Sequence, residues 1–258
     1  MGGGLLPFEV ISKYTNQDIF IVILKEAEVD LSQLKGYQFE VISFAKVGKI
    51  MKRMKSLNIK DVCFAGKVKK PVFSSLRPDI TGLFLLFKIL KLKHKGDDNV
   101  IKTIISFIES KGFDVKSVIE STPNIQMKKG FLTKSLPTKQ EEESIKLGID
   151  LLTATSQFDV GQACVLQEGV VIGIEGVEGT DELLKRCSLM KYKSKNSPIL
   201  IKSPKEGQSL KIDMPVIGLE TIIKLKEYGF RGIAVKAEGS IFLQAEKAIE
   251  FANENNIF

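Results

Sequence analysis

Short apolar runs rich in β-branched residues alternate with amphipathic helical patterns through the first half of the chain. Residues 19–24 and 39–43 predict strands, residues 47–57 predict a helix, and residues 62–65 predict a buried strand. This alternation is typical of βαβ units, in which helices cover a sheet with parallel strands. The first half is therefore predicted to form a Rossmann-like α/β domain.

The same pattern continues until the periodicity lapses near residue 121. Residues 83–93 and 99–111 predict helices, and residues 115–119 predict another strand. Beyond them lie Pro123, Gly130 and Pro137, which suit a connecting segment better than a regular element. We therefore expect an N-terminal domain over 1–122, a linker over 123–138 and a C-terminal domain over 139–258.

The second half is also predicted to mix helices and strands. Glu141, Glu142 and Glu143 lie in the first turn of a predicted helix over 139–155, where acidic side chains favour the positive end of the helix dipole. Two apolar runs, 163–167 and 170–175, are separated by Glu168 and Gly169, as in a two-residue hairpin. The remaining predicted elements are helices over 181–190, 219–228 and 244–255 and strands over 199–202 and 233–236.

Composition excludes several classes of protein. With 43% hydrophobic and 27% charged residues the chain is an ordinary globular one. Its longest apolar run, 83–87, is far shorter than the roughly 20 residues of a membrane-spanning helix. The first residues lack the pattern of a signal peptide, so we expect a cytoplasmic protein.

Cysteine and histidine are too scarce for several kinds of site. Cys63, Cys164 and Cys187 are widely spaced, which fits reduced core thiols better than a disulfide framework or a zinc site. The single histidine, His94, excludes a histidine-built metal cluster. Any metal is therefore expected to be hard and bound by carboxylates, which points to Mg²⁺ or Mn²⁺.

The charge differs between the two halves. Residues 1–138 carry 23 Lys and Arg against 13 Asp and Glu, whereas residues 139–258 carry 15 against 18. A basic half suits nucleic acid, an anionic membrane or a phosphorylated small molecule, or is simply a solvated surface. The helix over 83–93 sets apolar residues against lysines, which fits either core packing or contact with a membrane or acyl chains.

Candidate site residues in the first half lie in three segments. Gly2–Gly4 precede a helix predicted from Phe8, where main-chain N–H groups could approach a phosphate, although a flexible terminus would look the same. Gly66 and Lys67 follow a predicted strand, where open α/β sheets bind ligands, or they form a plain turn. Asp97 and Asp98 begin a predicted helix and either cap it or face a sugar or uracil.

Acidic residues of the second half gather where predicted elements meet. Asp213, Asp181 and Glu178 are candidates to hold a metal that bridges a diphosphate. Gly179 and Thr180 could contact a phosphate, or Thr180 and Asp181 could serve only as helix caps. Lys202, in a basic loop with Lys205 and Gln208, could neutralise phosphate charge in a transition state.

Six segments share a family pattern, namely GGGLLP at 2–7, CFAGKVKKPVFSSLRPD at 63–79, KGDDN at 95–99, FDVGQACV at 158–165, EGVEGTDELLKR at 175–186 and KSPKEGQSLKIDMPVIG at 202–218. In this order and spacing they resemble the LpxI-type UDP-2,3-diacylglucosamine pyrophosphatases of lipid A biosynthesis along nearly the whole chain. The resemblance implies hydrolysis of UDP-2,3-diacylglucosamine to UMP and 2,3-diacylglucosamine 1-phosphate (lipid X), with Mg²⁺ or possibly Mn²⁺. It also implies two α/β domains with the ligand between them, and a homodimer.

The resemblance also implies roles for individual residues. Asp213 and Asp181 become catalytic and metal-binding residues, with Glu178 as a further metal ligand. Asp159 and Gly161 are expected to face the ligand. The substrate contacts implied are Gly4, Leu5, Gly66, Lys67, Asp98, Gln162, Gly179, Thr180 and Lys202.

Two positions depart from the family pattern. Family members commonly have a short apolar strand before the glycine cluster, so the first sheet is expected to be one strand short here and the glycines unanchored. They also commonly have glycine where this chain has Ala163, which is tolerable unless that residue needs a positive φ.

Other functions remain open from the residues alone. A nucleotide-sugar binding or sensing protein could keep the same residues without turnover. Nucleic-acid binding is not expected, because the lysines are not interleaved with exposed aromatics and no known binding motif is present. A diacylated substrate implies transient contact with the inner face of the inner membrane.

Overall fold

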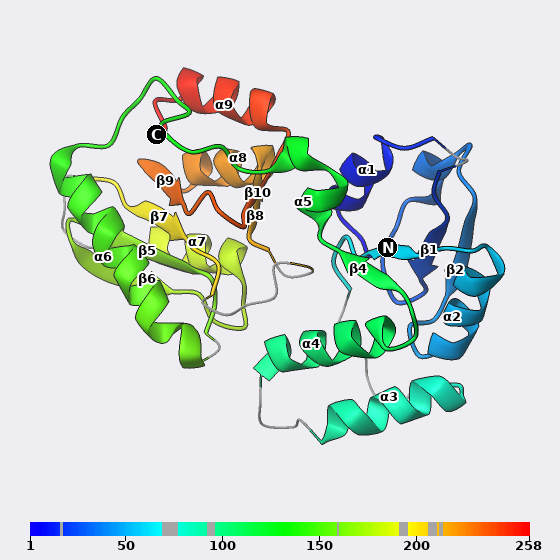
Figure 1. The fold of residues 1–258 in the computed structure, drawn as a ribbon. Coiled ribbons are helices and arrows are strands. Elements are labelled where there is room, and N and C mark those ends of the chain that lie inside the picture. The colour runs from blue at the N-terminus through cyan, green and yellow to red at the C-terminus, as the bar shows by residue number, and fades with distance from the viewer. Residues whose placement is uncertain are drawn as a thin grey trace. The chain divides into compact units, whose positions relative to one another are not determined.

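The computed structural model describes residues 1–15, 18–68, 77–91, 96–158, 160–190, 196–205, 211 and 214–258, and only the main chain of 96–98. The chain divides into two compact units, each a mixture of helices and strands (Figure 1). The first comprises Met1–Pro123 with Ser209–Asp213, and the second comprises Asn124–Gln208 with Met214–Phe258. The predicted two-domain α/β fold is confirmed.

The first unit contains short parallel strand pairs and helices that cover them. β1 pairs with β2 and β3 pairs with β4, both in parallel. Its described elements are α1 (Leu6–Ile11), β1 (Ile21–Leu24), β2 (Phe39–Ile42), α2 (Val47–Ser56), β3 (Asp61–Cys63), α3 (Ile80–Leu90), α4 (Gly96–Glu109), β4 (Asp114–Lys116) and α5 (Val118–Ser121). Because the described strands form two separate pairs, the Rossmann-like detail of the prediction is not confirmed.

Main-chain hydrogen bonds from the first three residues join these two pairs. The Met1 nitrogen donates to the Val22 carbonyl, and the Leu24 N–H donates to the Met1 carbonyl. On the other side, the Gly2 N–H donates to the Ala65 carbonyl at 2.7 Å. The expectation that the glycine cluster is unanchored was therefore wrong.

Helix caps explain where two sequence predictions missed. α3 begins three residues before the predicted start, because the Asp79 carboxylate accepts a hydrogen bond from the Gly82 N–H at 2.7 Å. The strand predicted over 115–119 stops at Lys116, because Ser117 and Glu120 form a capping box that starts α5. β3 forms, but its residues are exposed or half-buried and not buried as predicted.

The second unit has three layers around the four-stranded sheet β6-β5-β7-β9. β5 is antiparallel to both β6 and β7, and β7 is parallel to β9. A second parallel pair, β8 with β10, was not predicted. The elements are α6 (Lys139–Thr155), β5 (Ala163–Gln167), β6 (Val170–Ile174), α7 (Thr180–Ser188), β7 (Ile199–Lys202), β8 (Val216–Gly218), α8 (Leu219–Glu227), β9 (Gly232–Val235), β10 (Ile241–Leu243) and α9 (Ala245–Glu254).

Alternation along β5 shows how the layers pack. Cys164 and Leu166 belong to the apolar cluster on the α6 side of the sheet. Ala163 and Val165 belong to the cluster that includes α7, α8 and α9. All four side chains are fully buried, which explains the continuous apolar run in the sequence.

The predicted hairpin between β5 and β6 is confirmed. Both of its turn residues have positive φ, 50° at Glu168 and 78° at Gly169, as a type I′ turn requires. Ala163 is not among the residues with positive φ, so alanine is tolerated at this departure from the family pattern. Among the described residues no helix is both long and apolar enough to cross a bilayer.

Candidate functional site

One edge of the sheet in the second unit gathers several predicted site residues. The register of β5 with β7 pairs Ala163 with Lys202, so the start of β5 lies beside the end of β7. Gln162 directly precedes β5, and Glu175 directly follows β6, which ends at this same edge because β5 and β6 are antiparallel. Strand pairing therefore brings together residues that are 13 to 40 positions apart in the chain.

Glu175, Thr180 and Lys202 form a hydrogen-bonded network at this edge. The Thr180 hydroxyl donates to Glu175 Oε1 at 2.7 Å, and Lys202 Nζ donates to Thr180 Oγ1 at 2.9 Å. An ammonium group can only donate and a carboxylate can only accept, so the hydroxyl must accept from Lys202 and donate to Glu175. The donor and acceptor roles in this network are therefore fixed, from Lys202 to Thr180 to Glu175.

The network accounts for a buried positive charge. Lys202 is only 7% exposed, and burying an ammonium group is costly unless polar partners surround it. The Thr180 hydroxyl links it to the Glu175 carboxylate, whose other oxygen accepts from the Gln162 N–H at 2.7 Å. The edge of the sheet therefore holds a lysine in a defined position, suited to an anionic ligand.

Two glycines make this arrangement possible. A Cβ on Gly161 would lie 2.4 Å from the Glu175 Cβ, so no larger residue fits there without displacing the carboxylate. Gly179 has a φ of 82°, which L-residues rarely adopt, and it precedes Thr180 at the start of α7. Gly161 therefore allows Glu175 to lie close to the start of β5, and Gly179 allows the chain to turn into α7 at Thr180.

Two of the acidic residues predicted as metal ligands, Asp181 and Glu178, have protein partners. Asp181 pairs with Lys224 at 2.6 Å, and Glu178 accepts from Arg186 at 3.1 Å. Main-chain N–H groups of Glu178 and Gly176, and after them Arg186, hold the pKa of Glu178 below its usual value. The described residues contain no group of three or more His, Cys, Asp or Glu side chains placed to hold a metal.

The described residues therefore do not fit a complete metal site by themselves. Their oxygen donors suit Mg²⁺ chemically, but Asp181 and Glu178 each pair with a different cation of the protein. Asp213, the first predicted ligand, and Asp159 lie outside the described residues, as does His94. Asp98 lies in the first turn of α4, and the structure describes only the main chain of this residue.

In the first unit the predicted residues from two distant segments come together. Gly3 and Lys67 exchange main-chain hydrogen bonds at 2.8 and 2.9 Å, which places Gly4 and Leu5 next to this bridge. Gly66 has a φ of 94°, and a Cβ there would lie 2.6 Å from the Gly2 carbonyl carbon. The glycine cluster and the Gly66–Lys67 turn thus pack against each other in the first unit.

Glu175 is the network residue that sequence reasoning missed. The sequence pattern puts it at the end of the strand predicted over 170–175 and indicates no role for it. Its signal was a carboxylate that ends an apolar strand five residues before Thr180. Only the register of β5 with β7 brings Lys202 to the same edge, so the sequence alone does not indicate a partner for the Glu175 carboxylate.

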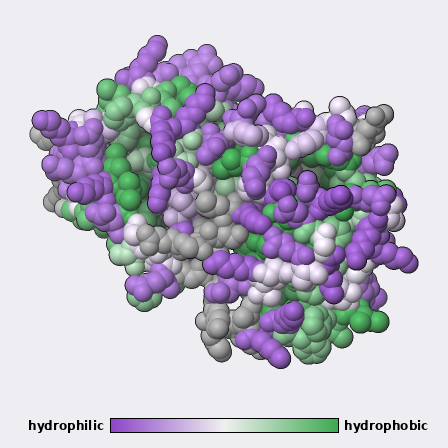
Figure 2. Space-filling view, viewed as in Figure 1, coloured by the Kyte–Doolittle hydropathy of each residue, from purple (hydrophilic) through white to green (hydrophobic). Residues whose placement is uncertain are grey.

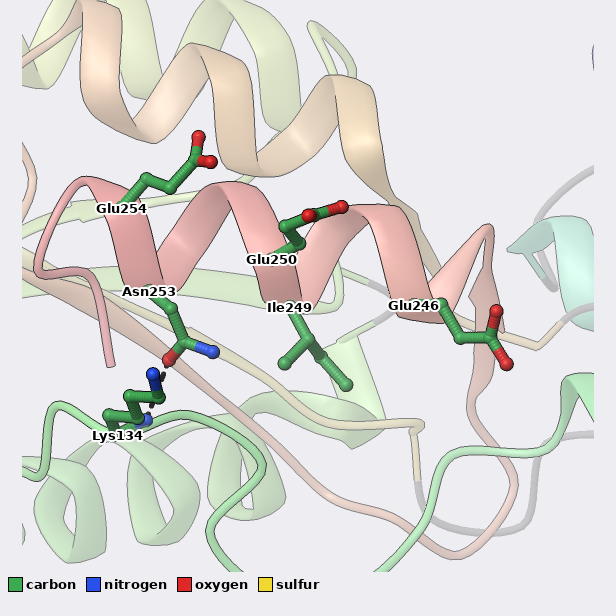
Figure 3. Close-up of a pocket in the computed structure, with 6 residues that line it drawn as sticks. All are labelled: Lys134, Glu246, Ile249, Glu250, Asn253 and Glu254. Atoms are coloured by element: carbon green, nitrogen blue, oxygen red, sulfur yellow. Dashed lines mark hydrogen bonds between the residues drawn. The ribbon is translucent and has the colours of Figure 1, made fainter.

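A groove elsewhere in the second unit is lined by none of the predicted residues. It runs along α9, where the Lys134 N–H donates to Asn253 Oδ1 at 2.7 Å (Figure 3). Its other lining residues are Glu246, Ile249, Glu250 and Glu254. Carboxylates on one helix face are common on solvated surfaces, so the groove carries no functional assignment.

Comparison with known proteins agrees with the resemblance seen in the sequence. Residues 1–125 match the LpxI N-terminal domain family, and residues 128–258 match the LpxI C-terminal domain family. The chain is 29% identical over 262 aligned positions to UDP-2,3-diacylglucosamine pyrophosphatase LpxI of Caulobacter vibrioides. That alignment covers 100% of this chain and 94% of its relative. With both domains matched in order, this chain belongs to the LpxI family.

Proposed function

We propose that this chain hydrolyses the diphosphate of UDP-2,3-diacylglucosamine to UMP and 2,3-diacylglucosamine 1-phosphate (lipid X) in lipid A biosynthesis. The name of the Caulobacter vibrioides relative, UDP-2,3-diacylglucosamine pyrophosphatase, supports the substrate and the reaction. The observation that carries the proposal in this chain is the Lys202 ammonium, held at a strand end through Thr180 and Glu175. A fixed cation at that place suits a diphosphate.

The chemistry needs positioning and charge neutralisation. A water oxygen forms a bond to one phosphorus while the bond from that phosphorus to the bridging oxygen breaks. The leaving phosphate keeps the electron pair, and the water loses a proton. Lys202 would offset the negative charge that develops on the phosphate oxygens, and it needs no reorientation because Thr180 already holds it.

The remaining roles in the proposal follow the family resemblance. Asp213 would hold a divalent cation or accept the proton of the attacking water, and Asp181 and Glu178 would assist at the metal. Mg²⁺ or Mn²⁺, when bound, would polarise the phosphate oxygens. Glycine and polar groups of the first unit would contact the nucleotide and sugar, namely Gly4, Leu5, Gly66, Lys67 and Asp98.

Two of these acids would have to leave their present partners to bind a metal. Asp181 pairs with Lys224 and Glu178 with Arg186. This arrangement makes Asp213 the first carboxylate to test. The proposal also includes a cytoplasmic enzyme that works as a homodimer.

The test is release of UMP and lipid X from UDP-2,3-diacylglucosamine, with both products identified by mass spectrometry. Wild type and Asp213→Ala are compared with Mg²⁺, with Mn²⁺ and with chelator. Metal-dependent release that is lost in Asp213→Ala supports the proposal. Binding of the nucleotide sugar by folded wild type, with no UMP released under any condition, would instead identify a binding or sensing protein.

A further inference from the structure

The outer face of α3 is hydrophobic and unusually exposed. Ile80 is 90% exposed, Phe84 55% and Phe87 58%, and Leu83 beside them is also exposed. Figure 2 shows hydrophobic residues gathered at the lower right of the view, where Figure 1 places α3. Contiguous exposed apolar patches on soluble domains commonly mark interaction sites.

Most of this face does not pack on the core, although the ring centre of Phe84 lies 6.2 Å from that of the buried Phe107. Gly82 and Leu85 are the buried residues of α3, and Leu85 belongs to the apolar cluster with α2 and α4. Ile80, Phe84 and Phe87 follow a spacing of four and three, so they form a second stripe on the helix. One side of α3 therefore supports the fold, and the other is apolar for another reason.

Positive charge borders the exposed stripe. Lys88 Nζ lies 4.9 Å from the ring centre of Phe84 and 5.7 Å from that of Phe107, so its ammonium group sits beside the exposed aromatic side chain. Lys91 follows at the end of the helix and is exposed. Residues 77–95 contain five Lys and Arg against one acid, Asp79.

The single acid lies at the N-terminal end of α3, whereas Lys88 and Lys91 lie at its C-terminal end. Its carboxylate accepts hydrogen bonds from the Gly82 N–H at 2.7 Å and from the Lys49 N–H at 3.0 Å, so it caps α3. The stripe is thus bordered by cations with no free carboxylate among the described residues of 77–91. Aromatic and aliphatic side chains beside lysines are the combination that binds the interface of an anionic bilayer.

We infer that the outer face of α3 docks on the surface of an anionic phospholipid membrane, with Ile80, Leu83, Phe84 and Phe87 inserted and Lys88 and Lys91 at the headgroups. Charge complementarity selects this occupant over a second copy of the chain, since two such basic faces would repel each other. The inference rests partly on the proposed function, because a diacylated substrate is held in a bilayer. It adds to that function the surface by which the enzyme reaches the substrate.

The test is flotation of the full chain with phosphatidylcholine vesicles, with or without an equal amount of phosphatidylglycerol. Wild type should float with the anionic vesicles, and higher salt should weaken binding because it screens the lysines. Ile80→Ser/Phe87→Ser should reduce the bound fraction at least about tenfold, as expected when two inserted apolar side chains are removed. Circular dichroism confirms that each variant is folded.

A matched control comes from the second unit. Phe158→Ser/Val177→Ser also removes two exposed apolar side chains, since Phe158 is 71% exposed and Val177 is fully exposed. This variant should bind vesicles as wild type does. Equal losses in both double variants would mean nonspecific hydrophobic adsorption and would overturn the assignment to α3.

Two further results would also overturn it. One is absence of wild-type binding to anionic vesicles. The other is a wild-type dimer that Ile80→Ser/Phe87→Ser converts to a monomer in sedimentation, which would make the face a contact between copies. Turnover of detergent-dispersed UDP-2,3-diacylglucosamine is measured in parallel, so failure of the proposed function is seen separately from failure of docking.

Discussion

The Lys202 ammonium donates to the Thr180 hydroxyl at 2.9 Å, although 22 residues separate them in the chain. The hydroxyl in turn donates to Glu175, so a buried cation and a carboxylate share one threonine. The lysine is held in place by partners on other elements and is not a flexible surface cation. The proposed phosphate contact is therefore already positioned before any ligand arrives.

Replacing Thr180 with valine should impair catalysis more than folding. Valine keeps the shape but removes both hydrogen bonds, so Lys202 and Glu175 lose their link. We expect kcat/KM to fall by roughly tenfold to hundredfold, because misplacing one charge-stabilising group has effects of that order. Steady-state UMP release measures the change.

Serine provides the control for this substitution. Thr180→Ser retains the hydroxyl and should keep most of the activity, whereas a role in packing alone would make serine the worse replacement. If Thr180→Val is as active as wild type, the network does not position Lys202 for the reaction.

Gly66 should be far less tolerant of alanine than another glycine with the same backbone angle. Gly66 and Gly36 have φ of 94° and 92°, but only at Gly66 would a Cβ meet other atoms, the Gly2 carbonyl carbon at 2.6 Å among them. Gly36→Ala should cost about 1 kcal/mol of unfolding free energy from backbone strain alone. Gly66→Ala should cost at least about 2 kcal/mol, since it also displaces the first residues.

Chemical denaturation followed by circular dichroism gives both free energies. Equal costs for the two variants would show that Gly2 and Gly3 do not pack against the Gly66–Lys67 turn in solution.

The thiol of Cys164 should resist alkylation in the native protein. Burial raises its pKa to about 12, and the side chain is fully buried between the sheet and α6. Because the thiolate is the reactive form, labelling at neutral pH should occur only after unfolding. Burial also raises the pKa of Cys63, but this residue is half-buried and should react sooner.

Mass spectrometry after timed alkylation ranks the three cysteines. Native Cys164 reacting as fast as Cys63 would contradict the packing of β5 against α6.

The Asp79 cap should give α3 a pH-dependent contribution to stability. Burial alone would raise the pKa of Asp79, but the N–H groups of Gly82, Gly48 and Lys49 together lower it below the ordinary value. A depressed folded pKa means that the contribution is full above the unfolded pKa of about 3.9 and is lost as pH falls through the folded pKa. Asp79→Ala should cost about 1 kcal/mol near neutral pH.

The pH dependence separates charge from capping. Asp79→Asn keeps a hydrogen-bond acceptor, so it should retain part of the stability while removing the acid-sensitive part. The measurement is the unfolding free energy of each variant relative to wild type between pH 3 and 7. If that difference does not change with pH for either variant, this account of the cap is contradicted.

Local signals in the sequence predicted the second unit well. The bounds of α6 follow from its capping box at Thr138 and Glu141, and the hairpin follows from Glu168 and Gly169. β8 and β10 escaped prediction because each has only three residues and neither shows a clear alternation. Strands this short are defined by their partner and not by their own sequence.

Long-range pairing limited what the sequence could predict of the site. Lys202 and Thr180 were proposed from their positions and from the family resemblance, yet their link through Glu175 depends on the register of β5 with β6 and β7. In the same way, Met1–Gly3 join two strand pairs through main-chain bonds that carry no side-chain signal. The Lys202 network and the anchoring of the first residues both depend on tertiary contacts that the sequence pattern does not indicate.

The most direct test of the central claim is the rate of UMP release from UDP-2,3-diacylglucosamine by wild type, Lys202→Met and Lys226→Met. Lys226 is an exposed lysine of α8 with no place in the network, so its variant controls for loss of one positive charge. We predict that Lys202→Met loses roughly a hundredfold or more in kcat while remaining folded, and that Lys226→Met keeps the wild-type rate. Wild-type activity in Lys202→Met, or no UMP from folded wild type, would contradict the account.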